Sequence, residues 1–337
     1  MARTLDAGHP TVRMHATVTQ QASPQARAAE ITGGLFRRLL VPINGNAASS
    51  VAIAFAIDIA QAGQGDLTFC YALDMRVLGM GSSLAIDPSW IDSLRPDADK
   101  VGRTALSRAT EAACTATLQV LEGSAEDVVL RLAPSFDLVV MGTRAISGFA
   151  HVLDHSTTDA VVRACSRPVL VVRESDTPST RRSSCTTFER LIVPIDGSKP
   201  SQTAIDVASA LASQRDGEVV FVYALDVARA TAFSGPYACD DGGAYEVMRR
   251  YGALLLTNAE TVARAAGARS VRTRLVVGAP LEAILAEIAA ESADAVIVGT
   301  HGRHGFDRAV HGSFTEDLMR KSPVPVLTLH PPVSNGA

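Results

Sequence analysis

The sequence predicts two α/β domains in tandem, each an open parallel sheet of five strands with helices on both faces. Three observations carry this prediction. An apolar pattern occurs twice along the chain, each copy alternates strand-length apolar runs with longer helical stretches, and the strand-length runs are continuously apolar. Continuous apolar strands that alternate with helices are typical of parallel sheets that are covered on both sides.

The duplication is visible as ordered matches between the two copies. Leu-Leu-Val-Pro-Ile-Asn-Gly at 39–45 recurs as Leu-Ile-Val-Pro-Ile-Asp-Gly at 191–197, a shift of 152 residues. Tyr-Ala-Leu-Asp returns after the same shift, and two later matches, Gly142 with Gly299 and Pro168 with Pro325, lie 157 residues apart. A nearly constant shift indicates a duplication with a few residues inserted in the second copy.

The elements of the second copy follow from its apolar periodicity. Apolar residues recur at helical spacing from Ala204 to Leu211, and Pro280 stands in the first turn of a later helix, where its missing N–H is harmless. The expected strands are 191–195, 218–224, 271–277, 293–299 and 324–329. The expected helices are 200–213, 244–266, 280–291 and 313–321.

The first copy differs at residues 76–100, where its second helix should begin. This stretch contains Trp90, the only tryptophan, together with Gly79, Gly81, Pro88 and Pro96, and we interpret it as irregular. It is either a lid or partner-binding loop, or a variable surface loop in which Trp90 packs against the domain.

Length and composition set the domain boundaries. The 337 residues are 47% hydrophobic and 20% charged, which suits about two globular domains at roughly 150 residues each. Residues 1–34 have no apolar period and are expected to be a flexible leader, and the Ser-, Thr- and Arg-rich residues 175–188 a linker. The domains are then 35–174 and 189–332.

Charge and cysteine usage exclude several classes of protein. The net charge of −4 and the absence of long basic runs argue against nucleic acid as a partner. No apolar run is long enough for a membrane span, and residues 1–34 lack a secretory apolar core. Five scattered cysteines without a CxxC pair favour the cytoplasm over a disulfide framework or a zinc site. None of the three lysines stands in a Walker A loop.

The segment 299–313 carries the most functional information. It joins an apolar strand to a helix, at the edge of the sheet where open α/β folds bind ligands. Gly299, Gly302, Gly305 and Gly312 let the backbone approach an anion, and the helix that starts at Gly312-Ser313 offers free N–H groups to a phosphate. Because the segment 299–313 contains no lysine, backbone N–H groups would provide most of the contacts to the phosphates, assisted by Arg303, His301 or His304.

The spacing Gly-x2-Gly-x9-Gly-Ser, together with Val-Pro-Ile-Asp-Gly-Ser at 193–198, resembles the ATP-binding type of the universal stress protein family. The resemblance covers roughly 39–172 and 191–329, and it implies the adenine nucleotide alpha hydrolase-like version of the Rossmann-like fold. It also implies that Asp196 binds the ribose, Ala224 contacts adenine, and the glycine motif surrounds the phosphates. The expected nucleotide-binding residues are Pro194, Ile195, Asp196, Ala224, Val298, Gly299, Thr300, Gly302, Arg303, Gly312, Ser313 and Phe314.

The residue chemistry agrees with this assignment. A carboxylate at the carboxyl end of a strand can accept two charge-assisted hydrogen bonds from ribose hydroxyls, and a small residue such as Ala224 leaves room for a base. Simpler explanations stand beside it. Asp196 could form a turn with Gly197, the glycines could satisfy a tight loop, and Ser313 with Glu316 could be a helix capping box.

The first copy has lost part of the motif. Asn44 replaces Asp196, Ala145 replaces Gly302 and His155 replaces Gly312, while Gly142 and Ser156 are retained. Side chains at the two lost glycines would block close approach of the backbone to a phosphate. We therefore expect the second domain to bind ATP, and the first to bind it much more weakly or not at all.

The sequence predicts an ATP-binding stress-response sensor or adaptor that is not clearly an enzyme, with slow ATP hydrolysis at most and Mg²⁺ held by the phosphates. No catalytic residue or protein metal site is assigned, because His301, His304 and His311 lack completing ligands. The apolar terminal strands could pair within the chain as a pseudo-dimer, and a homodimer is also possible. The alternatives are a scaffold that binds no nucleotide, and an adenylating or pyrophosphatase enzyme, whose Ser-Gly-Gly-x-Asp-Ser loop is absent.

Overall fold

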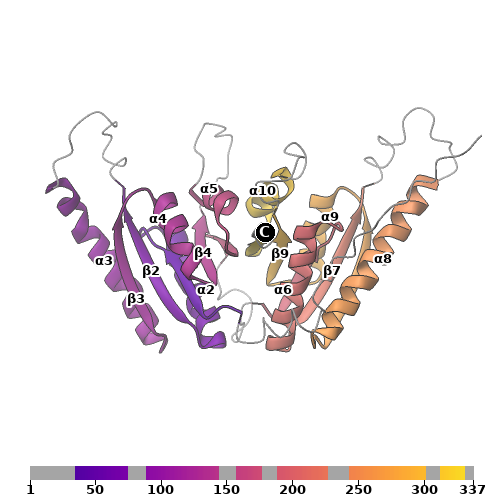
Figure 1. Ribbon diagram of the computed structural model, residues 1–337, viewed down its shortest axis with the longest axis horizontal. Coiled ribbons are helices and arrows are strands. Elements are labelled where there is room, and N and C mark those ends of the chain that lie inside the picture. The colour runs from indigo at the N-terminus through magenta and orange to yellow at the C-terminus, as the bar shows by residue number, and fades with distance from the viewer. Residues whose placement is uncertain are drawn as a thin grey trace, which may run out of the picture.

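The computed structural model describes residues 35–74, 89–143, 157–176, 188–226, 243–300 and 312–330. The expected leader at 1–34 lies outside these ranges. Within them, the chain forms two halves with the same order of elements, which Figure 1 shows side by side.

In its described residues the first half forms five strands and four α-helices. The strands are β1 (Arg38–Pro42), β2 (Asp66–Leu73), β3 (Ala116–Glu122), β4 (Leu138–Thr143) and β5 (Val169–Arg173). The helices are α2 (Ala47–Gly63), α3 (Ser89–Glu111), α4 (Ala125–Leu132) and α5 (Thr157–Ala164), and a 3₁₀ turn (Ala133–Ser135) follows α4.

The second half repeats this order and contains every element expected from its sequence. Its strands are β6 (Arg190–Pro194), β7 (Glu218–Leu225), β8 (Ser270–Val277), β9 (Ala295–Gly299) and β10 (Val326–Leu329). Its helices are α6 (Lys199–Arg215), α8 (Gly243–Ala265), α9 (Pro280–Ala290) and α10 (Gly312–Lys321).

The interpretation of residues 76–100 as irregular is wrong for its second part. Helix α3 begins at Ser89 and includes Trp90 and Pro96. Proline disfavours a helix interior, but Ala98, Ala105 and Ala109 are fully buried along one side of α3, and this packing outweighs the local cost. Residues 76–88 lie outside the described part of the chain.

The strands form one sheet in the order β3-β2-β1-β4-β5-β10-β9-β6-β7-β8. All pairs within each half are parallel, which confirms the two expected five-stranded parallel sheets. Helices cover both faces. One continuous apolar core packs α2, α3, α6 and α8 against the first face, and a second packs α4, α5, α9 and α10 against the other.

The two halves join through their last strands. β5 and β10 pair in antiparallel register, with Leu170 opposite Leu327, so the pairing of terminal strands expected for a pseudo-dimer occurs within one chain. The buried Thr328 hydroxyl donates to the carbonyl oxygen of Val169 (3.1 Å). Helices α5 and α10 lie side by side at the middle of the molecule (Figure 1), where Arg163 and Glu316 form an ion pair.

None of the helices in the described ranges is long and apolar enough to cross a bilayer.

Candidate functional site

The topology of the second half brings the predicted site residues to one edge of its sheet. From β6 the order runs through β7 to β8 on one side and through β9 to β10 on the other. The strand order therefore reverses between β6 and β9, and ligands of open α/β sheets bind in the crevice at such a point, beyond the carboxyl ends of the strands. Asp196 follows β6, and Gly299 is the last residue of β9.

Asp196 is exposed at this edge and held by a local turn. Its Oδ1 accepts the Ser198 N–H (2.9 Å), and its own N–H donates to the Ser201 hydroxyl (3.2 Å). The expectation that Asp196 forms a turn is thus confirmed, and the turn uses only one carboxylate oxygen. Within the described residues Oδ2 accepts no hydrogen bond, so this oxygen is available to a ligand hydroxyl.

Three other predicted residues surround the end of β6. Pro194 and Ala224 are half-buried, and Ile195 is buried while its N–H donates to the Val222 carbonyl oxygen (2.9 Å). Ile195 therefore fixes the path of the chain into Asp196. Pro194 and Ala224 are the small, partly accessible surfaces that could contact a base.

The last residues of β9 have roles within the fold. Val298 is buried in the core beneath α9 and α10. A Cβ atom on Gly299 would lie inside contact distance of the Pro200 backbone, so the packing of α6 against β9 requires glycine there. The Thr300 N–H and hydroxyl both donate to the carbonyl oxygen of Leu329 (2.6 and 3.1 Å). Gly299 and Thr300 thus have structural functions whether or not a ligand binds.

Helix α10 begins with Gly312 and Ser313 and has no acidic residue in its first turn. The corresponding helix α5 begins at Thr157 and carries Asp159 in its first turn. Phe314 is half-buried and packs on the same core as Val298. Glu316 forms an ion pair with Arg163 (3.1 Å). Asp159 and Glu316 occupy equivalent positions in the two copies, so both helices carry a carboxylate at the same place near their starts.

Part of the predicted motif falls outside the described residues. Gly302 and Arg303 belong to this part, as do the three histidines of the loop, and in the first copy so do Ala145, His155 and Ser156. Their roles remain predictions from the sequence. Gly312 and Ser313 are assigned to the helical backbone of α10, and the described part of the structure does not include their side chains.

Sequence reasoning missed two aromatic residues beside Asp196. Tyr251 of α8 lies against the turn at Gly197, where a Cβ atom would collide with its hydroxyl group, and its ring packs edge-on against Tyr223 (6.4 Å between ring centroids). Burial raises the pKa of Tyr223, and the nearby charges of Tyr251 and Asp196 add to this rise. The repeat Tyr-Ala-Leu-Asp marked Tyr223, but nothing in the sequence linked α8 to the turn.

Val277 is a second residue that the sequence did not single out. It ends β8, pairs with Leu225 and is 59% exposed. Because side chains alternate along a strand, Val277 lies on the same face of the sheet as Leu225, opposite the face of Ala224. The matching residue of the first half is Glu122, which pairs with Leu73 in the same register.

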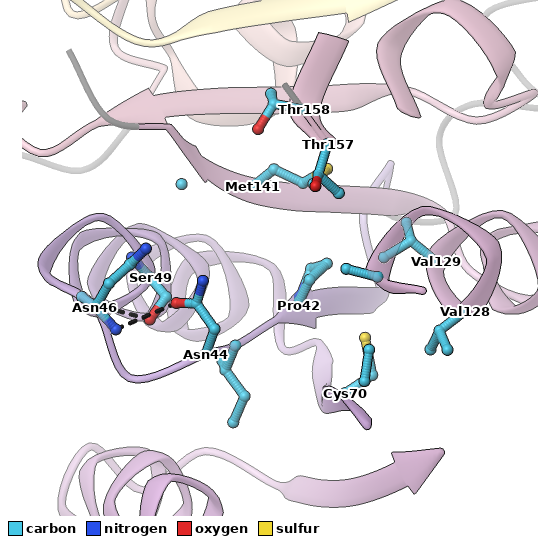
Figure 2. Close-up of a pocket in the computed structure, with 14 residues that line it drawn as sticks. Pro42, Asn44, Asn46, Ser49, Cys70, Val128, Val129, Met141, Thr157 and Thr158 are labelled. Carbon is cyan, nitrogen blue, oxygen red and sulfur yellow. Dashed lines mark hydrogen bonds between the residues drawn. The ribbon is translucent and has the colours of Figure 1, made fainter. Parts of the chain in front are cut away.

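The corresponding edge of the first half contains a pocket of about 120 Å³. It lies at the ends of β1, β2 and β4, between the starts of α2, α4 and α5. Figure 2 shows Asn44, Asn46 and Ser49 on one side of this pocket, and Cys70, Val128 and Val129 on the other. The first half thus retains a binding-sized hollow at the position that matches Asp196 and Ala224.

Fold and site together define the class of this protein. It is a tandem protein of the Rossmann-like α/β class, with a polar site at the strand-order reversal of each half. The chain belongs to the universal stress protein family, whose family model matches residues 35–173 and again residues 187–330. The membership of the universal stress protein family inferred from the motifs is therefore confirmed for both halves.

Three known proteins resemble this chain in sequence or in fold. A protein of Staphylococcus aureus (strain USA300), whose name places it among the universal stress proteins, is 29% identical over 144 residues, which are 42% of this chain and 84% of that protein. A universal stress protein from Archaeoglobus fulgidus DSM 4304 superimposes with a TM-score of 0.64 at 20% identity, covering 87% of this chain and 98% of that one. A universal stress protein solved in complex with cAMP is 26% identical over 43% of this chain and 98% of its own, with a TM-score of 0.32.

Proposed function

We propose that the second domain binds ATP and that the protein acts as a nucleotide-dependent sensor or adaptor in a cytoplasmic stress response. The observation that carries the proposal is the placement of Asp196. Its carboxylate is exposed at the strand-order reversal, and one of its two oxygens is not engaged by the described residues. A ribose diol supplies the hydroxyl donors that this oxygen lacks.

The neighbouring elements support the rest of the nucleotide. Ala224 and the neighbouring Val276, which pairs with it, are both half-buried and offer small or apolar surface for the adenine ring at the ends of β7 and β8. The start of α10 carries no acidic residue in its first turn, and its free N–H groups suit a phosphate. In this proposal Gly302, Gly312 and Ser313 contact the phosphates through the backbone, Arg303 assists, and Mg²⁺ is held by phosphate oxygens and water.

The proposal is for retention of the nucleotide, with slow hydrolysis at most. A scaffold that binds no nucleotide is the second candidate. The pairing of β5 with β10 favours the scaffold, because it joins the two domains without any ligand. Because this pairing occurs within the chain, a homodimer would need a different surface.

The direct test is mass spectrometry of small molecules carried through native purification of the full chain. The wild type is expected to retain adenine nucleotide, and the double variant Gly302→Ala/Gly312→His is expected to lose it. The matched control is Ala145→Gly, which changes the position equivalent to Gly302 in the first copy and should leave the retained nucleotide unchanged. Absence of nucleotide from the wild type, with no rise in melting temperature in millimolar ATP, would favour the scaffold.

A further inference from the structure

We propose that an exposed apolar face of helix α8 docks a second copy of this chain, so that two α8 helices meet across a two-fold axis. The face consists of Val247, Tyr251 and Leu254, and it is called the α8 face below. The β5–β10 pair is already used within the chain, so contact between chains requires another surface. The proposal goes beyond the proposed function and does not depend on nucleotide binding.

Exposed apolar side chains gather on this part of the molecule. Within the described ranges, the large exposed ones are Tyr245, Val247, Tyr251 and Leu254 of α8, and Val277 at the end of β8. Val247 and Leu254 are 67% and 71% exposed. Figure 1 shows α8 on the outer flank of the second half, on the far side from the β5–β10 joint. Single exposed apolar residues are ordinary, but a group on one element indicates an interaction surface.

The three residues of the α8 face form one stripe along the helix. Val247, Tyr251 and Leu254 are separated by four and three positions, which places them on the same side of α8. The side that packs on the core of the domain includes Leu256 and Ala259, both buried. The stripe therefore points away from the core of its own domain.

The first copy shows that the fold does not require apolar residues at these positions. Helix α3 corresponds to α8 with a shift of 154 residues, because the fully buried Ala105 and Ala109 match Ala259 and Ala263. With this shift, the three positions of the α8 face are polar in α3, where they are Ser93, Asp97 and Lys100. The apolar face is therefore a feature of the second domain that packing within the domain does not explain.

Tyr251 provides a rigid anchor at the middle of the α8 face. Its ring packs edge-on against Tyr223 (6.4 Å between ring centroids), and its hydroxyl group lies against the turn at Gly197. These contacts hold the ring in place, yet 48% of the residue stays exposed. An aromatic side chain that is already held loses little conformational freedom on binding, and such residues often dominate the energy of an interface.

The charges beside the stripe are complementary to themselves, which favours a second copy as the occupant. Glu246 accepts hydrogen bonds from Arg249 (2.7 Å) and from Arg250 (2.8 Å) on one flank of the stripe. A two-fold axis between Val247 and Tyr251 makes two α8 helices antiparallel, and each Tyr251 then faces the other copy's Val247. In this arrangement each Arg250 also lies within one turn of the other copy's Glu246. The same flank therefore presents opposite charges to itself across the axis.

The size of the α8 face predicts a weak and reversible dimer. A standard interface buries about 800 Å² on each partner, whereas even a whole aromatic side chain contributes only ~150–250 Å². Three partly exposed side chains on one helix supply less than the standard area. The dissociation constant is therefore expected in the range of about 1–100 μM.

The test is sedimentation equilibrium of the full chain over about 1–300 μM, a range that brackets this dissociation constant. The wild type is expected to change from monomer to dimer. Val247→Glu and Leu254→Glu should each weaken dimerisation by about tenfold or more, because each introduces an unpaired charge into the apolar contact. The matched control is Lys100→Glu, at the position of α3 that corresponds to Leu254, and it should leave the dissociation constant unchanged.

A charge-reversal series tests the two-fold arrangement. Glu246→Arg and Arg250→Glu each place like charges opposite each other across the axis, and each should weaken the dimer by about threefold or more. The double variant Glu246→Arg/Arg250→Glu restores opposite charges and should return to within about twofold of the wild type. These substitutions also change the ion pair within the helix, so melting curves establish that every variant is folded.

The proposal is overturned if the wild type is monomeric over the whole range, or if Val247→Glu and Leu254→Glu dimerise as the wild type does. It is also overturned if the folded double variant dimerises as weakly as the single charge reversals, because the two α8 helices then do not meet across a two-fold axis. None of these outcomes bears on ATP binding by the second domain, which is measured separately.

Discussion

Gly299 at the end of β9 lies in backbone contact with Pro200 in the first turn of α6, so that a Cβ atom on this glycine would overlap the Pro200 carbonyl group. The same relationship links Gly142 and Ala48 in the first half. The glycine is present in both copies, whereas Asp196, Gly302 and Gly312 are present in one. Helix packing alone therefore accounts for Gly299, and the residues that distinguish the two domains are the better indicators of nucleotide binding.

Gly299→Ala is expected to destabilise the protein by about 1–3 kcal/mol, because overpacking against a backbone cannot be relieved by a side-chain rotation. Gly142→Ala should have a similar cost. Urea denaturation followed by circular dichroism measures both. Gly63→Ala is the matched control, since a Cβ atom there would lie 3.5 Å from the Phe36 carbonyl oxygen, an ordinary contact in a helix. A Gly299→Ala protein as stable as the control would show that α6 shifts without cost.

Asp196→Asn is expected to weaken ATP binding by about 10- to 100-fold, because hydrogen bonds to a charged acceptor contribute about 1.5–3 kcal/mol. Folding should be unaffected, since the amide oxygen can still accept the Ser198 N–H. Calorimetric titration with ATP measures the change. The reverse substitution Asn44→Asp in the first domain should not create a second ATP site, because Ala145 and His155 remain there. Unchanged affinity in Asp196→Asn would remove Asp196 from the site.

The strands and most helices could be predicted from sequence because the inner strands are continuous apolar runs, whereas the edge strands β3 (ATLQVLE) and β8 (SVRTRLVV) mix polar and apolar residues. The start of α3 could not, because Pro96 and the polar residues around it mask a packing face that only the tertiary structure reveals. The contact of Tyr251 with the turn at Gly197 was missed for a related reason. It joins residues 54 positions apart in sequence, from two elements that share no motif.

The site was predicted in parts. The position of Asp196 follows directly from the end of an apolar strand, and the structure places it at the expected edge. The role of Gly299 could not be separated into packing and ligand contact, since both require a residue without a Cβ atom. The pocket of the first half was also not predicted, because losing a glycine motif says nothing about the space that remains behind it.

The two halves are expected to unfold cooperatively, because their cores are continuous across the β5–β10 pair. Leu170 and Leu327 are opposite each other in the β5–β10 pair, and both are fully buried. In a double-mutant cycle, Leu170→Ala and Leu327→Ala should show a coupling energy of about 1 kcal/mol. The control cycle combines Leu170→Ala with Leu191→Ala in β6, three strands and roughly 14 Å away, and should be additive. Additivity in both cycles would mean that the halves fold independently.

Stability should depend on pH through Asp294, a half-buried residue directly before β9. Its Oδ2 accepts the N–H groups of Glu189 and Arg190 (2.8 Å each), while Oδ1 has no partner among the described residues. Burial raises the pKa of this carboxyl group to about 7, and the charge of Glu189 contributes to the rise. Between pH ~4, the usual value for Asp, and pH 7 the folded state thus binds more protons than the unfolded state.

The free energy of unfolding is therefore expected to decrease as pH rises through this window. Asp294→Asn keeps an acceptor for the two N–H groups and cannot lose a proton, so it should match the wild type near pH 4 and be more stable by about 1–2 kcal/mol at pH 8. The charge of Arg215 interacts favourably with the Asp294 carboxylate. Because the asparagine variant loses this attraction, its gain in stability is expected to be small. Urea denaturation at pH 4.5, 6 and 8 measures the free energy of unfolding of both proteins.

The matched control is Asp137→Asn, because Asp137 binds the Arg38 guanidinium (2.9 Å) at the equivalent position of the first half. It should lose the charge of that ion pair and gain no stability at pH 8. Equal pH profiles for Asp294→Asn and the wild type would show that folding does not shift the pKa of Asp294.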